Sequence, residues 1–285
     1  MYAIINNLYK GVYGELKNII KYGVFILLII FLIISCTGSL SQNVNYRRTF
    51  SSDDIIFPDE ENQMDELSLM YYNIRFGKGM DGKLDIHRIY EVIKFSQTDI
   101  IGLSEVDWGL FRSGRVKQAE YLSEKLNMNY AFGSAIDMIE GSYGNAIISR
   151  FPLTKINNYR LPLLKEDDEP RALLEATTSI PGQGKVRIMV THLTLDRKTR
   201  LEQLKWIRYH IRENVDEEFI LLGDFNGSIK PLLDDDINYK TVPTFPSRGA
   251  ESEIDYIISS FDLKNEKVIE TEASDHLPLL TDVSF

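Results

Sequence analysis

The chain has 285 residues, of which 44% are hydrophobic and 26% are charged, and its formal net charge is −10. This is the ordinary composition of a globular protein, and its acidity argues against a general binder of nucleic-acid backbone. A bound metal ion could offset that charge locally. The single cysteine, Cys36, excludes a disulfide within the chain and any metal site built from several cysteines.

The first 36 residues have the pattern of an export signal. Lys10, Lys17 and Lys21 precede an apolar run of 13 residues, 22–34, which is short for a membrane span. The run closes in Ile33-Ile34-Ser35-Cys36, which resembles the lipobox of bacterial lipoproteins. That resemblance implies a lipidated Cys36 at the mature N-terminus, and it predicts a cell-envelope protein lipid-anchored to a bacterial membrane with its domain exported. The alternative is an uncleaved signal anchor, because the leader before the apolar run is long.

Residues 37–65 are polar and show no periodicity, which predicts a flexible tether. A flexible coil of this length spans roughly 30 Å on average, so we expect the domain to stay near the membrane surface without being embedded. After Cys36 the chain holds 29 basic and 41 acidic residues, a formal charge of −12. The exported part is therefore acidic.

Residues 66–285 contain no internal repeat and no low-complexity stretch, which predicts one domain. In chain order, the apolar patterns predict a strand at 67–76, a helix at 86–95, a strand at 99–106, a helix at 118–126, strands at 130–135, 145–149, 173–180 and 186–191, a helix at 199–215, and strands at 219–222, 255–259 and 279–285. The third helix has the clearest pattern, with an apolar side made of Leu201, Leu204, Ile207, Tyr209 and Ile211. Successive strands between early and late helices favour two packed sheets covered by helices over a doubly wound parallel sheet.

Acidic, amide and imidazole side chains recur where these strands begin or end. They are Asn73, Glu105, His192, Asp224 with Asn226, Asp255, and Asp275 with His276. Any one of them could be an ordinary turn residue, but the same chemistry at six strand ends favours a site. In Gly223-Asp224-Phe225-Asn226, an extended backbone puts Asp224 and Asn226 on one face and Phe225 on the other.

The same residues carry a resemblance to the endonuclease/exonuclease/phosphatase (DNase I-like) superfamily of metal-dependent hydrolases. The matching motifs are Tyr72-Asn73-Ile74, Leu103-Ser104-Glu105, Gly144-Asn145-Ala146-Ile147-Ile148-Ser149-Arg150, Thr191-His192-Leu193, Gly223-Asp224-Phe225-Asn226, Ile254-Asp255-Tyr256 and Ser274-Asp275-His276. One departure is Ser104, where many members have Gln. The resemblance implies an α/β fold (α+β), a four-layered α/β/β/α sandwich of two mainly antiparallel sheets, with the site at one rim.

The resemblance also implies a hard divalent cation, Mg²⁺ with Mn²⁺ as a possible substitute, held by Glu105 together with Asn73 and Asp275. It gives Asp224 the role of base for the attacking water, with Asn226 orienting that water or a phosphate oxygen.

His192 and His276 would stabilise the charge that grows on the phosphoryl oxygens, and Asp255 would hold His276 in its working tautomer. Either histidine could instead be a satisfied buried side chain. Two of only four histidines fall at the two strongest expected places, which favours the site. The other two, His87 and His210, lie in helical segments and are expected to be structural.

Asn145 and Arg171 are expected on the substrate side of the site. Asn145 could also be a turn residue after Gly144, and Arg171 could either bind phosphate or be solvated. The acidic run 234–236 is expected to be a solvated turn and not a second metal site.

The expected protein is a monomeric, exported, membrane-tethered Mg²⁺-dependent phosphoesterase. Further marks, Arg112-Ser113-Gly114 with Gln118 and Glu169-Pro170-Arg171, resemble compact bacterial metal-dependent hydrolases of the superfamily. Related domains occur in sphingomyelinases, and the tether and the acidity favour a phospholipid, sphingolipid or small-molecule phosphodiester as substrate. A secreted nuclease is the alternative, but no basic stretch interleaved with aromatic residues lies near the site. A non-catalytic surface binding protein ranks lower, since every expected role is filled.

Overall fold

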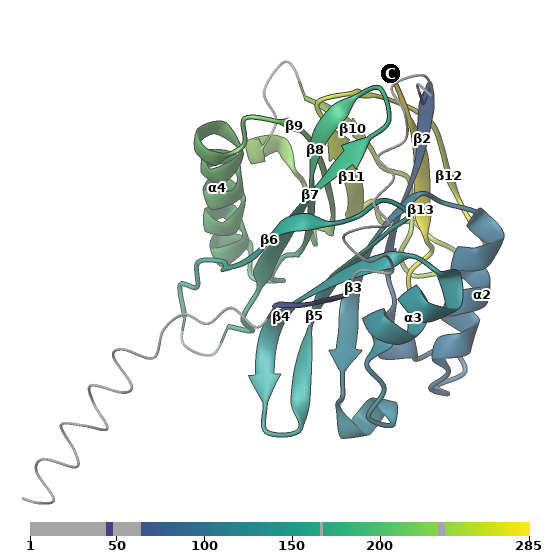
Figure 1. Cartoon of the computed structure of the whole chain (residues 1–285). Helices are drawn as coiled ribbons and strands as arrows, with labels where there is room; N and C mark the ends of the chain where they lie inside the picture. Colours follow the sequence, from purple (N-terminus) through teal and green to yellow (C-terminus); the bar gives the residue numbers. More distant parts are fainter. Residues whose placement is uncertain (1–43, 48–63, 166–167, 233–236) are drawn as a thin grey trace, which may run out of the picture. The chain divides into compact units, whose positions relative to one another are not determined.

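The computed structural model describes residues 44–47, 64–165, 168–232 and 237–285 (Figure 1). The chain divides into two units, Met1–Ser41 and Gln42–Phe285, and all the described residues belong to the second. Cys36, the apolar run 22–34 and the acidic run 234–236 lie outside them. No helix in the described ranges is long and apolar enough to cross a membrane.

Two β-sheets stack face to face, and helices cover their outer faces (Figure 1). The first sheet consists of β1 (Val44–Arg47), β2 (Glu66–Asn73), β3 (Ile100–Trp108), β4 (Asn129–Met138), β5 (Gly141–Ser149), β12 (Asp262–Val268) and β13 (Leu279–Ser284). The second consists of β6 (Thr154–Arg160), β7 (Ala172–Ile180), β8 (Gly184–His192), β9 (Glu218–Asp224), β10 (Asn238–Lys240) and β11 (Asp255–Ser259). Their strand orders are β1-β4-β5-β3-β2-β13-β12 and β10-β11-β9-β8-β7-β6.

The helices are α2 (Ile86–Ser96), α3 (Gln118–Leu126) and α4 (Arg197–Asn214), and short 3₁₀ turns occur at η1 (Arg75–Gly77), η2 (Phe111–Ser113) and η3 (Lys230–Leu232). Buried side chains of α2 and α3 pack on the seven-stranded sheet, and those of α4 pack on the six-stranded sheet. The predicted four-layered α/β/β/α sandwich is confirmed.

Each sheet is antiparallel apart from one parallel pair, β2 with β3 and β8 with β9. A parallel pair needs a crossover connection, which α2 supplies in the first sheet and α4 in the second. Because parallel strands end at the same sheet edge, Asn73 pairs with Ser104, and His192 pairs with Asp224. This topology turns polar residues that are distant in sequence into neighbours.

The main core lies between the two sheets. Ile147, Ile188 and Leu222 are fully buried there. Gly102 lies at a point of close approach, since a Cβ at this position would be 3.0 Å from both Leu222 Cβ and Val190 Cγ2. The sheets are therefore held together by close packing immediately behind the strand ends.

The α4 helix begins at its N-cap Asp196, whose carboxylate accepts hydrogen bonds from the backbone N–H groups of Lys198 and Thr199. Leu204, Ile207 and Ile211 are buried as predicted. Two members of the predicted apolar side are wrong: Leu201 is 38% exposed and Tyr209 is 63% exposed. Tyr209 lies two positions from both Ile207 and Ile211, which turns it to the opposite face of a helix.

Four strands, β1, β6, β10 and β12, were not predicted, and all four lie at a sheet edge. An edge strand has one neighbour and carries polar side chains, so the apolar signal is weak there. β1 falls inside 37–65, and the prediction of a flexible tether is therefore wrong for Val44–Arg47. These residues form an antiparallel pair with β4, so backbone pairing orders a segment that composition assigns to a coil.

The inter-sheet core allows a direct test of stability. Replacing the fully buried Ile188 with Ala should lower the free energy of unfolding by about 2–5 kcal/mol, because it removes packed methyl groups and leaves a cavity. Ile139→Ala is the matched control, since Ile139 is 106% exposed and should change stability by under about 0.5 kcal/mol. Chemical denaturation of both variants measures the difference, and equal losses would contradict the assigned core.

Candidate active site

Polar strand ends from both sheets meet at one edge of the sandwich. In the six-stranded sheet, His192 and Asp224 pair across β8 and β9, and Asp255 at the start of β11 pairs with Asp224. From the other sheet, the Asn73 side-chain amide donates a hydrogen bond to Asp224 Oδ2 at 3.2 Å. His276 joins them from the loop before β13. The structure therefore brings the predicted catalytic residues together.

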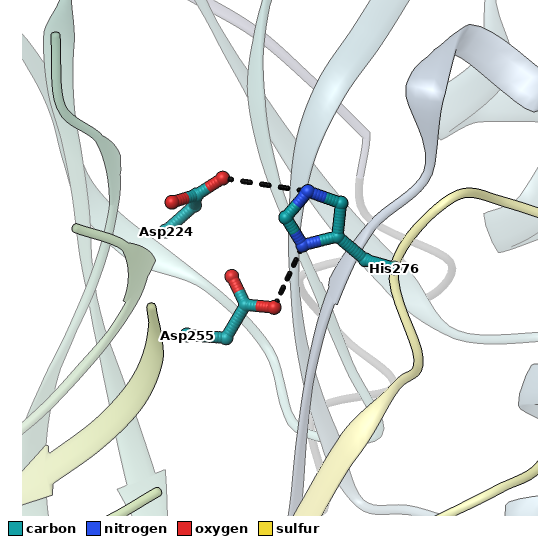
Figure 2. A group of neighbouring side chains, drawn as sticks. All are labelled: Asp224, Asp255 and His276. Carbon is teal, nitrogen blue, oxygen red and sulfur yellow. Dashed lines mark hydrogen bonds and ion pairs between the residues drawn. The ribbon is translucent and has the colours of Figure 1, made fainter. Parts of the chain in front are cut away.

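The His276 imidazole faces two buried carboxylates, one near each of its ring nitrogens (Figure 2). Its Nδ1 donates to Asp255 Oδ2 at 2.8 Å, and its Nε2 is 3.8 Å from Asp224 Oδ2. Thr244 Oγ1 also donates to Asp255 Oδ2, at 2.6 Å, which fixes the carboxylate. Burial lowers the pKa of His276, but the charge and hydrogen bond of Asp255 outweigh burial and raise the pKa to about 9. His276 is therefore an imidazolium at neutral pH.

Asp224 is buried and has the properties of a general base. Burial, followed by the charge of Asp255, raises the pKa of Asp224 to about 7, although His276 and the Asn226 backbone N–H oppose that rise. The Asn226 N–H donates to Oδ1 at 2.9 Å, while Asn73 donates to Oδ2. A carboxylate with a pKa near neutrality is well placed to take a proton from water.

His192 differs from His276 because its neighbour is a cation. Arg171 Nη1 lies 3.1 Å from His192 Nδ1, and a guanidinium can only donate, so Nδ1 accepts. Burial, then the charges of Arg171 and His276, lower the pKa of His192 well below its ordinary value. The ring is therefore neutral with its proton on Nε2, which lies 3.5 Å from Asp224 Oδ2. Arg171 itself is buried, which excludes the solvated alternative.

Asn226 belongs to the same group. Its Nδ2 donates to the Leu193 carbonyl at 2.8 Å and lies 3.1 Å from His192 Nε2, so two N–H donors meet there and this second contact is not a hydrogen bond. Its φ of 50° is left-handed, a conformation that Asn tolerates better than most residues. The intervening Phe225 is fully buried and meets the Tyr256 ring edge-on at 5.6 Å, so the alternation predicted from the sequence is confirmed.

Glu105 is turned toward the site by a break in its strand. The pairing of β3 with β5 shifts register between Leu103 and Val106, and Glu105 has a φ of 58°. A β-bulge of this kind re-aims a side chain at the cost of local strain. Glu105 Oε1 accepts a hydrogen bond from Asn73 Nδ2 at 3.1 Å, which ties it to the end of β2.

The donor set of Glu105, Asn73 and Asp275 fits a hard divalent cation. Burial, and to a smaller degree Asp275, raise the pKa of Glu105, so a cation between these groups would relieve both penalties. Asp275 meets Arg75 Nε at 3.2 Å, and the Arg75 backbone N–H donates to Asn73 Oδ1 at 3.1 Å. The cation would polarise a phosphoryl oxygen and neutralise its charge.

A second group, Asp224, Asp255 and His276, also brings its ligand atoms within 4.8 Å of one another. We assign it to proton and charge chemistry and not to metal binding. A protonated imidazole has no lone pair for a metal, and its Nδ1 already donates to Asp255. A cation held by Glu105, Asn73 and Asp275 would therefore bind apart from the imidazolium.

Asn145 is buried and bonded within the protein. Its Nδ2 donates to the Ala172 carbonyl at 2.9 Å, and its Oδ1 accepts from Ser104 Oγ at 3.2 Å. Ser104 in turn accepts from Tyr71 at 2.7 Å, so these side chains link the two sheets beneath the site. The substrate role of Asn145 stays a prediction.

Sequence reasoning gave no role to one wall of the site. Arg112 forms two hydrogen bonds to the fully buried Asp107, at 2.6 and 2.9 Å, and its guanidinium lies 4.2 Å from the Phe76 ring and 5.2 Å from the Tyr143 ring. Gln118 holds this wall by donating to the Phe76 carbonyl and accepting from the Asp107 N–H. The Arg112 and Gln118 motif positions carried the signal, but their contacts depend on the fold.

The sequence profile of the Endonuclease/Exonuclease/phosphatase family matches residues 70–276. This chain belongs to that family. The match spans the site from Asn73 to His276, and family members are metal-dependent hydrolases of phosphoric esters.

The chain is 31% identical over 109 residues to the uncharacterized protein YbhP of Escherichia coli K12, a match that spans 38% of this chain and 42% of YbhP. Solved structures share its fold. An endonuclease/exonuclease/phosphatase of Beutenbergia cavernae has a TM-score of 0.62 and 22% identity over 78% of this chain and 72% of its own. A mannosyl-6-phosphatase of Bacteroides thetaiotaomicron gives 0.59 and 18%, covering 77% and 100%. A humanized TDP2 of D. rerio gives 0.61 and 17%, covering 78% and 100%.

The charge states of the site predict its pH profile. We expect kcat/KM for a soluble phosphodiester to rise as Asp224 loses its proton near pKa about 7, because a base acts deprotonated. It should fall as His276 loses its proton near pKa about 9, because a charged donor acts protonated. Asp255→Asn removes the charge that raises both pKa values, so both limbs should move to lower pH.

The matched control is Asp262→Asn, which alters an exposed carboxylate on β12 and should leave the profile unchanged. A folded Asp255→Asn enzyme with an unmoved alkaline limb would show that His276 does not carry it.

Proposed function

We propose that this protein is an exported, membrane-tethered, Mg²⁺-dependent phosphodiesterase that acts on a lipid or small-molecule phosphodiester. The proposal that the protein is a hydrolase depends on the position of Asp224, which lies close to one neutral and one positively charged histidine. Its Oδ2 lies 3.5 Å from the neutral His192 and 3.8 Å from the charged His276. One base and two N–H donors therefore lie close enough together to contact the same phosphate group.

In this mechanism Asp224 takes a proton from water, and the water oxygen forms a bond to phosphorus as the bond to the leaving alkoxide breaks. The alkoxide then takes a proton from solvent. His276, as an imidazolium, and His192, through its Nε2–H, donate to the phosphoryl oxygens and stabilise the added negative charge. Glu105, Asn73 and Asp275 would hold Mg²⁺. Arg171 keeps His192 neutral and in the tautomer that donates.

The proposed lipid or small-molecule substrate is supported by charge and by the expected tether. The chain after Cys36 has a formal charge of −12, which disfavours a long polyanion. A lipobox-like Cys36 would keep the domain close to a bilayer, where phosphodiester headgroups are concentrated.

A nuclease is the second candidate. The observation that favours it is Arg112, whose side chain is 43% exposed between the rings of Phe76 and Tyr143. A guanidinium beside aromatic rings can receive a nucleotide by charge and stacking.

A substrate panel tests the proposal. The full chain should hydrolyse a soluble bis-aryl phosphate and at least one lipid phosphodiester, sphingomyelin or a phospholipid, and should lose this activity in EDTA and regain it with Mg²⁺ or Mn²⁺. Asp224→Asn should lower the rate by at least about 100-fold, as loss of a general base does. Asp216→Asn is the control, because Asp216 is an exposed carboxylate two residues before β9, at the end of the strand opposite Asp224. Activity on plasmid DNA alone would favour the nuclease, and activity indifferent to EDTA would contradict the metal role.

Cys36→Ser tests the anchor. If lipidation holds the protein, the variant should move from the membrane fraction to the soluble fraction when the cells are fractionated, because the modified residue is gone. Retention in the membrane fraction would instead support the uncleaved signal anchor. Lys21→Ser, which leaves the lipobox-like ending intact, is the control and should stay with the membrane.

A further inference from the structure

Large exposed apolar side chains concentrate at the active-site edge. Of the eleven in the described part of the chain, six lie in or next to the turns that follow the strand ends at this edge. These six, which we call the apolar rim, are Phe111, Met138, Ile139, Leu163, Leu164 and Leu195. Single exposed apolar residues are common, but a cluster beside a site indicates a binding surface.

The first part of the rim lies on two adjoining loops. Met138 and Ile139 form the tip of the β4–β5 hairpin, and Phe111 begins η2 just after β3. The two loops touch, since a Cβ at Gly109 would lie 3.7 Å from the Glu140 carbonyl oxygen. Figure 1 shows the hairpin and the turn after β3 extending past the same end of the sheet.

Two ion pairs connect this part to the rest of the rim. Arg160, at the end of β6, pairs with Asp137 beside the hairpin tip at 3.0 Å, and the chain continues from Arg160 to Leu163 and Leu164. Lys165 then pairs with Asp196, next to Leu195, at 2.8 Å. Charged pairs therefore link the separate apolar groups of the rim from η2 to the start of α4.

The rim borders the chemistry directly. Phe111 precedes Arg112, which packs on Phe76 in η1, and Leu195 comes three residues after His192. A surface that contacts the rim would therefore present its outermost groups to the site.

We infer that the apolar rim docks the protein on the surface of a phospholipid bilayer, so that the site faces the headgroups; this inference rests on the proposed function. Ile139 is 106% exposed and Phe111 is 73% exposed, so both could enter the headgroup region without rearrangement. Beside Phe111, the loop 110–117 adds the basic side chains of Arg115 and Lys117 and holds no acidic residue, which suits contact with phosphate headgroups. Charged residues divide the rim into small groups, which fits insertion of separate side chains better than one flat dry interface with a second copy.

Site-specific labels on the full chain test this docking. In a Cys36→Ser background, an environment-sensitive fluorophore at Ile139→Cys should shift to the blue and be quenched by spin-labelled lipid when the protein is reconstituted in phosphatidylcholine–phosphatidylglycerol vesicles. The matched control is Phe95→Cys, on α2, where Phe95 is 78% exposed away from the rim. Its label should stay in water. Equal, unquenched signals at both positions would overturn the inference.

Activity gives an independent measure. The double variant Phe111→Ser with Ile139→Ser should cut hydrolysis of a vesicle-borne lipid phosphodiester by about tenfold or more, because two apolar anchors are lost. Hydrolysis of a soluble bis-aryl phosphate should be unchanged, and Phe95→Ser should change neither. If the soluble substrate is turned over and the lipid rate does not fall, the docking surface is wrong while the proposed phosphodiesterase stands. A blue shift at position 139 that needs DNA, or that grows with protein concentration without vesicles, would also overturn it.

Discussion

Two buried carboxylates lie opposite each other on adjacent strands, and the rest of the site depends on how their mutual repulsion is offset. Asp224 ends β9 and pairs with Asp255 at the start of antiparallel β11. Both are almost or fully buried, and like charges in that position repel. The positively charged His276 lies close to both carboxylates and offsets their repulsion. Burial and the charge of Asp255 raise the pKa of Asp224, the base, and Asp255 holds the neighbouring His276 in its charged form.

The second histidine is held in the opposite state by a different neighbour. Arg171, buried at the start of β7, places its guanidinium on His192 and keeps that ring neutral. The two histidines of the site therefore differ in charge, because His276 is paired with a carboxylate and His192 with a guanidinium. An extra proton on His192 would place a further positive charge close to Arg171 and His276, which burial and the repulsion from both cations disfavour.

Much of this could be predicted from sequence where a residue's role is local. The apolar run before Gly223 fixed β9, and alternation put Phe225 in the core opposite Asp224 and Asn226. What could not be predicted depends on contacts between distant segments. The bulge that aims Glu105 appears only in the pairing of β3 with β5, and four polar edge strands carry no apolar pattern of their own. From the sequence, Arg171 is expected either to bind phosphate or to be solvated. Its actual partner, a histidine 21 residues away, follows only from the fold.

Ser104 bears on how chemistry and specificity divide between the base of the site and its loops. Ser104 accepts from Tyr71 and donates toward both Asn145 and the Thr191 carbonyl, so a small hydroxyl joins the two sheets directly under the site. A Gln there would need more space where the packing leaves none, since Ser104 is fully buried. The floor is therefore built from short, mutually bonded groups with little freedom to adapt. Adaptation to different phosphodiesters has to come from the loops above it, where exposed side chains such as Phe111 and Ile139 can change without disturbing the proton chemistry below.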